Sequence, residues 1–116
     1  MITIDFNKQN EKRIIIKGKC ETFRANVKDI THIVCDAYLS TIYATTGRKF
    51  SVSHSLKNFE DNLKEEDGFV RVNRNILINT EHVISTKHKE KKLNVNGIDI
   101  KASRDGFAQL KKMFYC

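Results

Sequence analysis

The sequence predicts a mainly β domain with one short mid-chain helix and a C-terminal helix. Short segments that alternate between apolar and polar residues, or that are rich in β-branched residues, follow one another along most of the chain. Only two segments place apolar residues at helical spacing. The chain has 116 residues and no proline, and it contains no Gly/Ser-rich tract. We therefore expect one compact domain.

The first half of the chain is predicted to consist of strands. One segment is a β-branched run and the next two alternate between apolar and polar residues. The last two flank the turn residues Thr46 and Gly47, which predicts a hairpin. The five segments are 13–17, 21–27, 29–34, 40–44 and 49–53.

The mid-chain helix is predicted between Ser55 and Gly68. Leu56, Phe59 and Leu63 fall at positions i, i+3 and i+7, so they lie on one helical face. Serine is a favoured N-cap residue and glycine commonly ends a helix. Most of the acidic residues of this segment lie on its later turns.

The second half of the chain begins with a predicted strand over 69–79, because FVRVNRNILIN starts as a clean alternation. A short strand at 83–86 and the basic loop KHKEKK follow. The segment 93–100 has an Asn-Gly pair between apolar residues, which is typical of a hairpin with a type I′ turn. The final helix is predicted over 104–114, with apolar residues along one face.

The charge balance favours a polyanionic partner. The formal net charge is +7 and the sequence pI is about 9.4. The window 60–67 holds five acidic residues and one lysine, so the rest of the chain is more basic than the total indicates. Neutralising nucleic-acid phosphates releases condensed counterions, which favours binding by a basic protein. A soluble protein that is merely basic remains the alternative.

Composition and motifs argue against several other classes. The longest aliphatic runs are three residues, and the N-terminus has neither a basic start nor an apolar stretch, so neither a membrane span nor an export signal is expected. Three cysteines at irregular spacing are expected to be free thiols in a reducing cytoplasm. No catalytic motif is found, and His32-x-x-Cys35 alone is a weak metal signal. We expect no enzyme activity, no cofactor, no metal site and no small-molecule substrate.

The distribution of polar residues favours double-stranded over single-stranded nucleic acid. Single-strand binders stack bases on aromatic rings, whereas Phe69, Phe107 and Phe114 lie at predicted core positions. Arginine and asparagine, which read guanine and adenine in the major groove, instead occur at strand ends and in loops. They include Arg71, Asn73, Arg74, Asn75 and Arg104, accompanied by the lysines of 87–92 and Lys101.

The order of these motifs resembles a known family. The stretch GFVRVNRNILINTEHVISTKHKEKKLNVNGIDIKASRDGFAQLKKMF is similar to the C-terminal half of a LytTR domain, the DNA-binding output module of many bacterial response regulators. Upstream, Asp29-Ile30, CDAYLSTIYATTGRKF and Ser55-Leu56 are similar to the family's D-I, aromatic loop, hairpin and helix start. The match is colinear over about residues 12–114, so we assign 12–116 to a LytTR-like domain and 1–11 to an N-terminal extension.

The resemblance implies an elongated stack of small antiparallel sheets that inserts loops into successive major grooves. It implies base reading by Tyr38, Leu39, Asn73, Arg74, Asn75 and Arg104. It implies phosphate contacts by Ser40, Arg48, Ser55, Lys57, Arg71, Lys101 and Ser103. The acidic half of the mid-chain helix should then point away from DNA. Asn73, Asn75 and Leu39 differ from the residues usual in the family, so the target sequence does not carry over.

The predicted function is that of a cytoplasmic bacterial transcriptional regulator, without a receiver domain, that binds specific sequences in double-stranded DNA. The resemblance to the family implies two-component signalling and binding as a homodimer to repeated DNA sites. Two alternatives remain. A free-standing interaction or anti-activator module would pair with a full-length regulator without binding DNA, and a small metal or redox protein would use Cys35 and His32.

Overall fold

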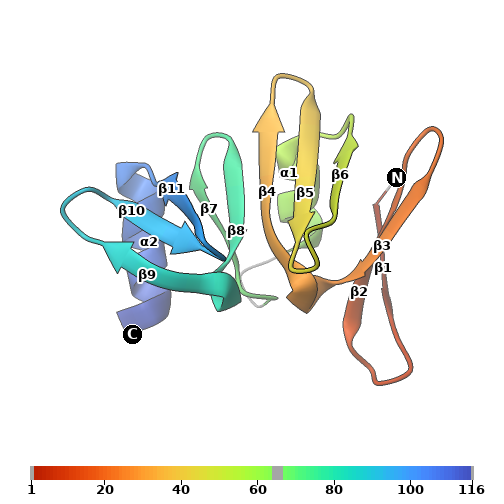
Figure 1. Cartoon of the computed structure of the whole chain (residues 1–116), viewed down its shortest axis with the longest axis horizontal. Helices are drawn as coiled ribbons and strands as arrows, with labels where there is room; N and C mark the ends of the chain where they lie inside the picture. The colour runs from red at the N-terminus through yellow and green to blue at the C-terminus, as the bar shows by residue number, and fades with distance from the viewer. Residues whose placement is uncertain (1, 64–66, 116) are drawn as a thin grey trace.

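The computed structural model describes residues 2–63 and 67–115, and it contains three antiparallel sheets and two α-helices along a molecule of 43 × 34 × 24 Å (Figure 1). The N-terminal sheet has the order β1-β2-β3, formed by Ile2–Phe6, Lys12–Lys17 and Thr22–Asn26. The central sheet has the order β6-β5-β4-β8-β7, formed by Lys49–Val52, Leu39–Ala44, Ile30–Asp36, Ile76–Asn79 and Phe69–Asn73. The C-terminal sheet has the order β11-β10-β9, formed by Ile98–Lys101, Lys92–Val95 and Val83–Lys87. The mainly β fold class predicted from the sequence is confirmed.

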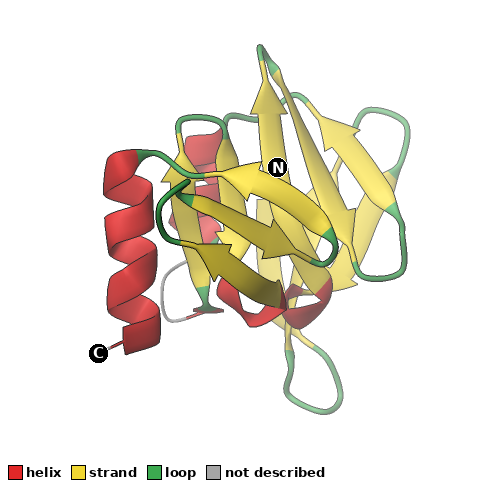
Figure 2. Cartoon of the chain, turned by 60° about the vertical axis from the view of Figure 1, so that its left-hand side comes forward, coloured by secondary structure: helices red, strands yellow, loops and turns green. Residues whose placement is uncertain are grey.

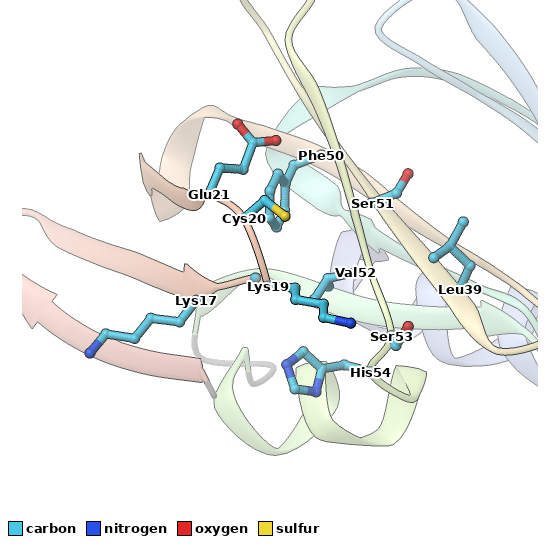
Figure 3. A pocket seen from close by; sticks show the side chains of 11 residues that line it. Lys17, Lys19, Cys20, Glu21, Leu39, Phe50, Ser51, Val52, Ser53 and His54 are labelled. Atoms are coloured by element: carbon cyan, nitrogen blue, oxygen red, sulfur yellow. The ribbon is translucent and has the colours of Figure 1, made fainter.

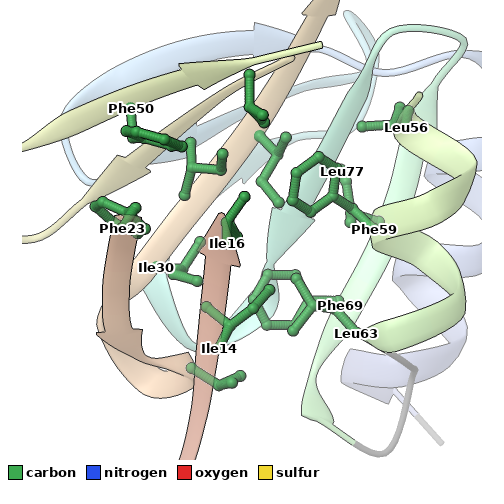
Figure 4. Packing of buried hydrophobic residues seen from close by; sticks show 14 residues of the cluster. Ile14, Ile16, Phe23, Ile30, Phe50, Leu56, Phe59, Leu63, Phe69 and Leu77 are labelled. Carbon is green, nitrogen blue, oxygen red and sulfur yellow. The ribbon is translucent and has the colours of Figure 1, made fainter. Parts of the chain in front are cut away.

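One hydrophobic core joins the N-terminal sheet, the central sheet and helix α1 (Leu56–Asn62). Figure 4 shows Phe59 and Leu56 of α1 beside Leu77, with Ile14 and Ile16 of β2 in the same cluster. Each of these side chains is at most 3% exposed. The face of α1 that carries Leu56 and Phe59 is therefore the face that covers the sheet, and Leu63, directly after the helix, is buried in the same core.

A second core lies on the other side of β7 and β8. Val70, Val72 and Ile78 pack there against the C-terminal sheet and helix α2 (Arg104–Tyr115). Because successive side chains of a strand point to opposite faces, β7 and β8 supply residues to both cores. These two strands connect the two halves of the molecule.

Several local predictions hold. The Ser55 hydroxyl accepts a hydrogen bond from the Asn58 amide at 3.3 Å, as expected of the N-cap of α1. The turn at Asn96 and Gly97 has φ angles of 51° and 92°, as a type I′ hairpin requires, and it joins β10 to β11.

Other local predictions are wrong. Residues 69–79 form a hairpin of β7 and β8 rather than one strand. Helix α1 ends at Asn62 instead of reaching Gly68. Leu63 has extended backbone angles, and its side chain is buried in the first core. Residues 64–66 of the predicted helix lie outside the described residues. Strand β1, which the sequence analysis did not predict, pairs with β2.

Burial of His32 predicts a pH-dependent stability. Its ring is 4% exposed, stacks on Tyr43 at 4.4 Å, and lies with Nδ1 2.9 Å from the Thr31 hydroxyl. Burial lowers the pKa of His32, so the unfolded chain takes up a proton first as pH falls below about 6.5. Protonation therefore favours unfolding, and stability should fall as the pH drops below about 6.5.

Urea unfolding at pH 7.5 and pH 5 measures this effect. We expect a lower midpoint at pH 5, and a smaller difference in His32→Gln than in the wild type. An equal difference in both proteins would show that His32 does not set the dependence.

Candidate nucleic-acid interface

The three segments predicted to read bases lie along one edge of the molecule. They are residues 36–39 between β4 and β5, residues 73–75 between β7 and β8, and residues 103–104 at the start of α2, and together we call them the recognition edge. All three lie at the upper edge in Figure 1, and Figure 2 shows the same arrangement from another side. The fold thus brings together segments that are up to 68 positions apart in the sequence.

Backbone hydrogen bonds hold the three segments side by side. The Cys35 amide donates to the Asn75 carbonyl at 2.8 Å, which joins the first segment to the second. The Asn73 side-chain amide donates to the Lys101 carbonyl at 2.7 Å, and the Ser103 amide donates to the Val72 carbonyl at 2.7 Å. Residues from both of the first two segments line an open groove of about 460 Å³, among them Asp36, Arg74 and Asn75.

The first segment presents apolar surface to solvent. The side chain of Tyr38 is 89% exposed and that of Leu39 is 46% exposed. Ala37 has a φ of 55° and turns the chain between β4 and β5. These two side chains therefore give the hairpin tip an apolar surface that contributes nothing to either core.

The second segment is fixed by Arg71 and Asn73. The Asn73 Oδ1 atom accepts from the Asn75 amide at 2.8 Å. Arg71 donates to the carbonyls of Asn73 and Arg74 at 3.3 and 2.5 Å, and forms an ion pair with Glu60 at 2.7 Å. Both polar atoms of Asn73 and the guanidinium of Arg71 are therefore occupied within the protein.

The third segment begins helix α2. The Ser103 hydroxyl accepts from the Gly106 amide at 3.0 Å and so caps the helix. The same hydroxyl donates to the Val72 carbonyl at 3.2 Å, which ties the start of the helix to β7. Arg104 follows directly and is exposed.

Two arginines of the recognition edge are available to a ligand. The side chains of Arg74 and Arg104 are exposed, and neither forms a hydrogen bond or ion pair with residues 2–63 or 67–115. A guanidinium presents several donors in a planar fork that matches O6 and N7 of guanine. The edge therefore combines fixed backbones with free guanidinium groups.

The residues predicted to contact phosphates are distributed less evenly. Ser103 belongs to the recognition edge and Lys101 adjoins it. Lys57 extends from the first turn of α1, 3.8 Å from Asp61. Ser40 is buried, and its hydroxyl donates to the His54 carbonyl at 2.5 Å.

Arg48 lies apart from this group. It belongs to the turn between β5 and β6, at the end of β5 opposite to the turn that carries Tyr38 (Figure 1). Its guanidinium lies 5.1 Å from the centre of the Phe23 ring. The predicted phosphate contact of Arg48 stays a prediction, and it requires DNA at the opposite end of the central sheet.

The described acidic residues near α1 are paired with basic ones. Glu60 contacts Arg71, Asp61 lies near Lys57, and Asp67 contacts Lys12 at 2.8 Å. Glu65 and Glu66 lie outside the described residues. The pairing of Glu60 explains a role of Arg71 that the sequence analysis missed, because an Arg and a Glu eleven positions apart give no local signal.

The structure also bears on the alternative sites. Among the described residues, no three His, Cys, Asp or Glu side chains gather in a possible metal site. Within the same residues, no helix combines the length and apolar character that a bilayer crossing needs. A cavity of about 520 Å³ lies between the β2–β3 turn and β6, with Lys19, Phe50 and His54 among its lining residues (Figure 3).

Comparison with known proteins identifies the fold and the family. The family model described as the LytTr DNA-binding domain matches residues 20–115. A solved structure of the LytTr DNA-binding domain of a methyl-accepting/DNA response regulator from Bacillus cereus superposes with a TM-score of 0.75. It is 17% identical, and the match covers 90% of this chain and 97% of that one. No curated protein matches the chain in sequence. Because the family model spans most of the chain, the protein belongs to the LytTR family of DNA-binding domains.

Proposed function

We propose that this protein is a transcriptional regulator that binds specific sequences in double-stranded DNA, with its recognition edge inserted into successive major grooves. The observation that carries the proposal is the convergence of the three loop segments on one edge. Two hairpins and a capped helix hold them, and hydrogen bonds between the segments fix their relative positions. Such rigidity reduces the ordering cost of binding.

The proposed roles follow the accessibility of the side chains. Arg74 and Arg104 would read guanines by bidentate hydrogen bonds, and Asn75 would offer its exposed amide to adenine. Tyr38 and Leu39 would contact bases or sugars by apolar surface. Asn73 would contact DNA through a side-chain amide that already forms hydrogen bonds within the protein.

Contacts to phosphates would fix the register of the protein on the duplex. Those nearest the recognition edge would come from Lys101 and Ser103. Lys57, the Ser55-capped start of α1 and Arg71 complete the proposed set. The structure favours neither Ser40, which is buried, nor Arg48, which lies at the opposite end of β5 (Figure 1), as a contact for a duplex on the recognition edge. A net charge of +7 supports this attraction.

Selection of bound duplexes from a random pool tests the proposal. We expect an enriched sequence with two or more base-specific positions per protein copy, and binding that weakens steeply with salt. A pull-down with a full-length LytTR regulator, run beside a gel shift, tests the alternative. A chain that captures the regulator but shifts no duplex would be an interaction module.

The biological setting is proposed from the family. A regulator of this kind would act in the bacterial cytoplasm, as an output domain for response-regulator signalling. Binding as a homodimer to repeated sites would appear in the selected sequences as two copies of one motif at fixed spacing.

Replacing Arg71 with alanine should reduce the discrimination between the selected duplex and a random one. The turn at 73–75 loses its bonds to Arg71, so Arg74 and Asn75 lose their fixed position. Fluorescence anisotropy over a salt series measures both affinity and salt slope. A slope lower by about 0.9 would also support the predicted phosphate contact. Unchanged discrimination would show that Arg71 does not position the turn.

A further inference from the structure

Three lysines form a row across the C-terminal sheet. Lys92 of β10 lies directly opposite Lys87 of β9 and opposite Lys101 of β11. The next residue of β10, Leu93, is buried in the second core. Because side chains alternate along a strand, the three lysines point away from that core, and all three are exposed.

No acidic side chain neutralises this row among the described residues. None of the three lysines forms an ion pair with residues 2–63 or 67–115. The acidic residues nearest in the sheet and its loop are Asp99, which accepts a hydrogen bond from Asn94 at 3.1 Å, and Glu90. Like charges directly opposite each other destabilise a sheet. The row is therefore a concentrated positive charge that folding alone does not favour.

The row is continuous with the recognition edge. Lys101 is the last residue of β11, and its carbonyl accepts the bond from the Asn73 side chain. Neighbouring strands lie about 4.8 Å apart, so the row extends roughly 10 Å from there across the sheet. Figure 2 shows this sheet in front of the rest of the protein, with α2 starting beside the end of β11.

The backbone that carries the row is well fixed. The Ala102 amide donates to the Lys91 carbonyl at 2.8 Å and extends the pairing of β10 with β11. In the loop between β9 and β10, the ring of His88 packs edge-on against Phe107 of α2, with centroids 5.8 Å apart. The lysines thus share one rigid platform with the recognition edge.

We propose that Lys87 and Lys92, together with Lys101, bind the phosphates of duplex DNA that flank the bases contacted by the recognition edge. This inference rests on the proposed function, because it needs a duplex seated on that edge. A lysine ammonium is a compact point charge on a flexible stem, which suits a phosphate rather than a base edge. The row would therefore add affinity without adding sequence preference.

The double variant Lys87→Gln/Lys92→Gln tests the proposal. Its affinity should fall by the same factor on a selected duplex and on a random one, and its salt slope should fall by about 1.8. The matched control is Lys8→Gln/Lys49→Gln, which removes two exposed lysines from turns and strands far from the row. This control should keep the wild-type slope.

A single charge reversal, Lys92→Glu, separates binding from folding. The new carboxylate would face Lys87 and Lys101, so thermal stability should stay equal or rise. DNA affinity should nevertheless fall more than in Lys92→Gln, with the larger loss at low salt.

The outcomes distinguish the two proposals. Wild-type protein that binds neither duplex would overturn both. In a second outcome, the wild type binds a selected duplex while the double variant shows the same affinity and salt slope as the control. That result would overturn only the proposal for the lysine row.

Discussion

Replacing Gly106 with alanine is expected to destabilise the protein and to impair DNA binding. A Cβ atom at this position would lie 2.0 Å from the Val72 carbonyl oxygen of β7 and 2.5 Å from its carbon. Both are backbone atoms, so no side-chain rotation can relieve the overlap. Overpacking of this kind costs about 1–3 kcal/mol, or roughly 4–12 °C in Tm for a chain of this size. In an unhindered helix the same substitution would instead stabilise by about 1 kcal/mol.

The overlap at Gly106 should also displace residues of the recognition edge. The Val72 carbonyl accepts hydrogen bonds from the amide and the hydroxyl of Ser103, so a shift of α2 away from β7 displaces Ser103 and Arg104. Lys111→Ala, at an exposed position of the same helix, is the control for helix propensity. Thermal unfolding of both variants measures the effect. A Tm for Gly106→Ala at or above that of the wild type would show that the helix and strand are not in the close contact described.

Local signals in the sequence predict the fold well where the turn itself dictates the structure. The Asn-Gly pair at 96–97 defines a hairpin because both residues tolerate positive φ. The turn at Arg74 and Asn75 has no glycine, and its alternating pattern continues into β8. Its bonds are partly local, from Arg71 to the Arg74 carbonyl and from the Asn75 amide to Asn73 Oδ1, and one comes from the Cys35 amide, far away in the sequence. Alternation alone therefore hid this turn, although an Asn side chain that bonds the amide two residues further on is a local turn signal.

The length of α1 was overestimated because the apolar pattern continues past the end of the helix. Its apolar face matches the core at Leu56, Phe59 and Leu63, but the helix ends before Leu63. The N-terminal strand β1 was missed because five residues give little periodicity. It pairs with β2 at the edge of the N-terminal sheet.

The candidate site was only partly predictable. The resemblance to the family supplied the three loop segments, and the fold places them on one edge. The resemblance did not show that Ser40 is buried or that Arg71 is paired with Glu60. Arg48 is separated from the edge because β5 has six residues, a length of about 20 Å. Strand direction, rather than sequence distance, decides which loops meet.

Replacing Arg104 with alanine should weaken binding to the selected duplex by about 1–3 kcal/mol, or roughly 5–150-fold in Kd. The guanidinium is exposed at the first residue of α2, and the Ser103 cap and the bonds to Val72 fix its backbone. The loss should be confined to the selected duplex and should relax the preference at one base pair. Folding should not suffer, because a cation at a helix N-terminus opposes the helix dipole.

Two further variants decide between base reading and simple attraction. Arg104→Lys keeps the charge but lacks the planar fork, so it should keep the salt slope of the wild type and lose the base preference. Lys112→Ala removes a cation from the other end of α2 and should leave both the salt slope and the base preference unchanged. Equal losses of Arg104→Ala on selected and random duplexes would mean that Arg104 contacts phosphates. Base discrimination would then depend on Arg74, Asn75 and the Tyr38 turn, which are also exposed on the recognition edge.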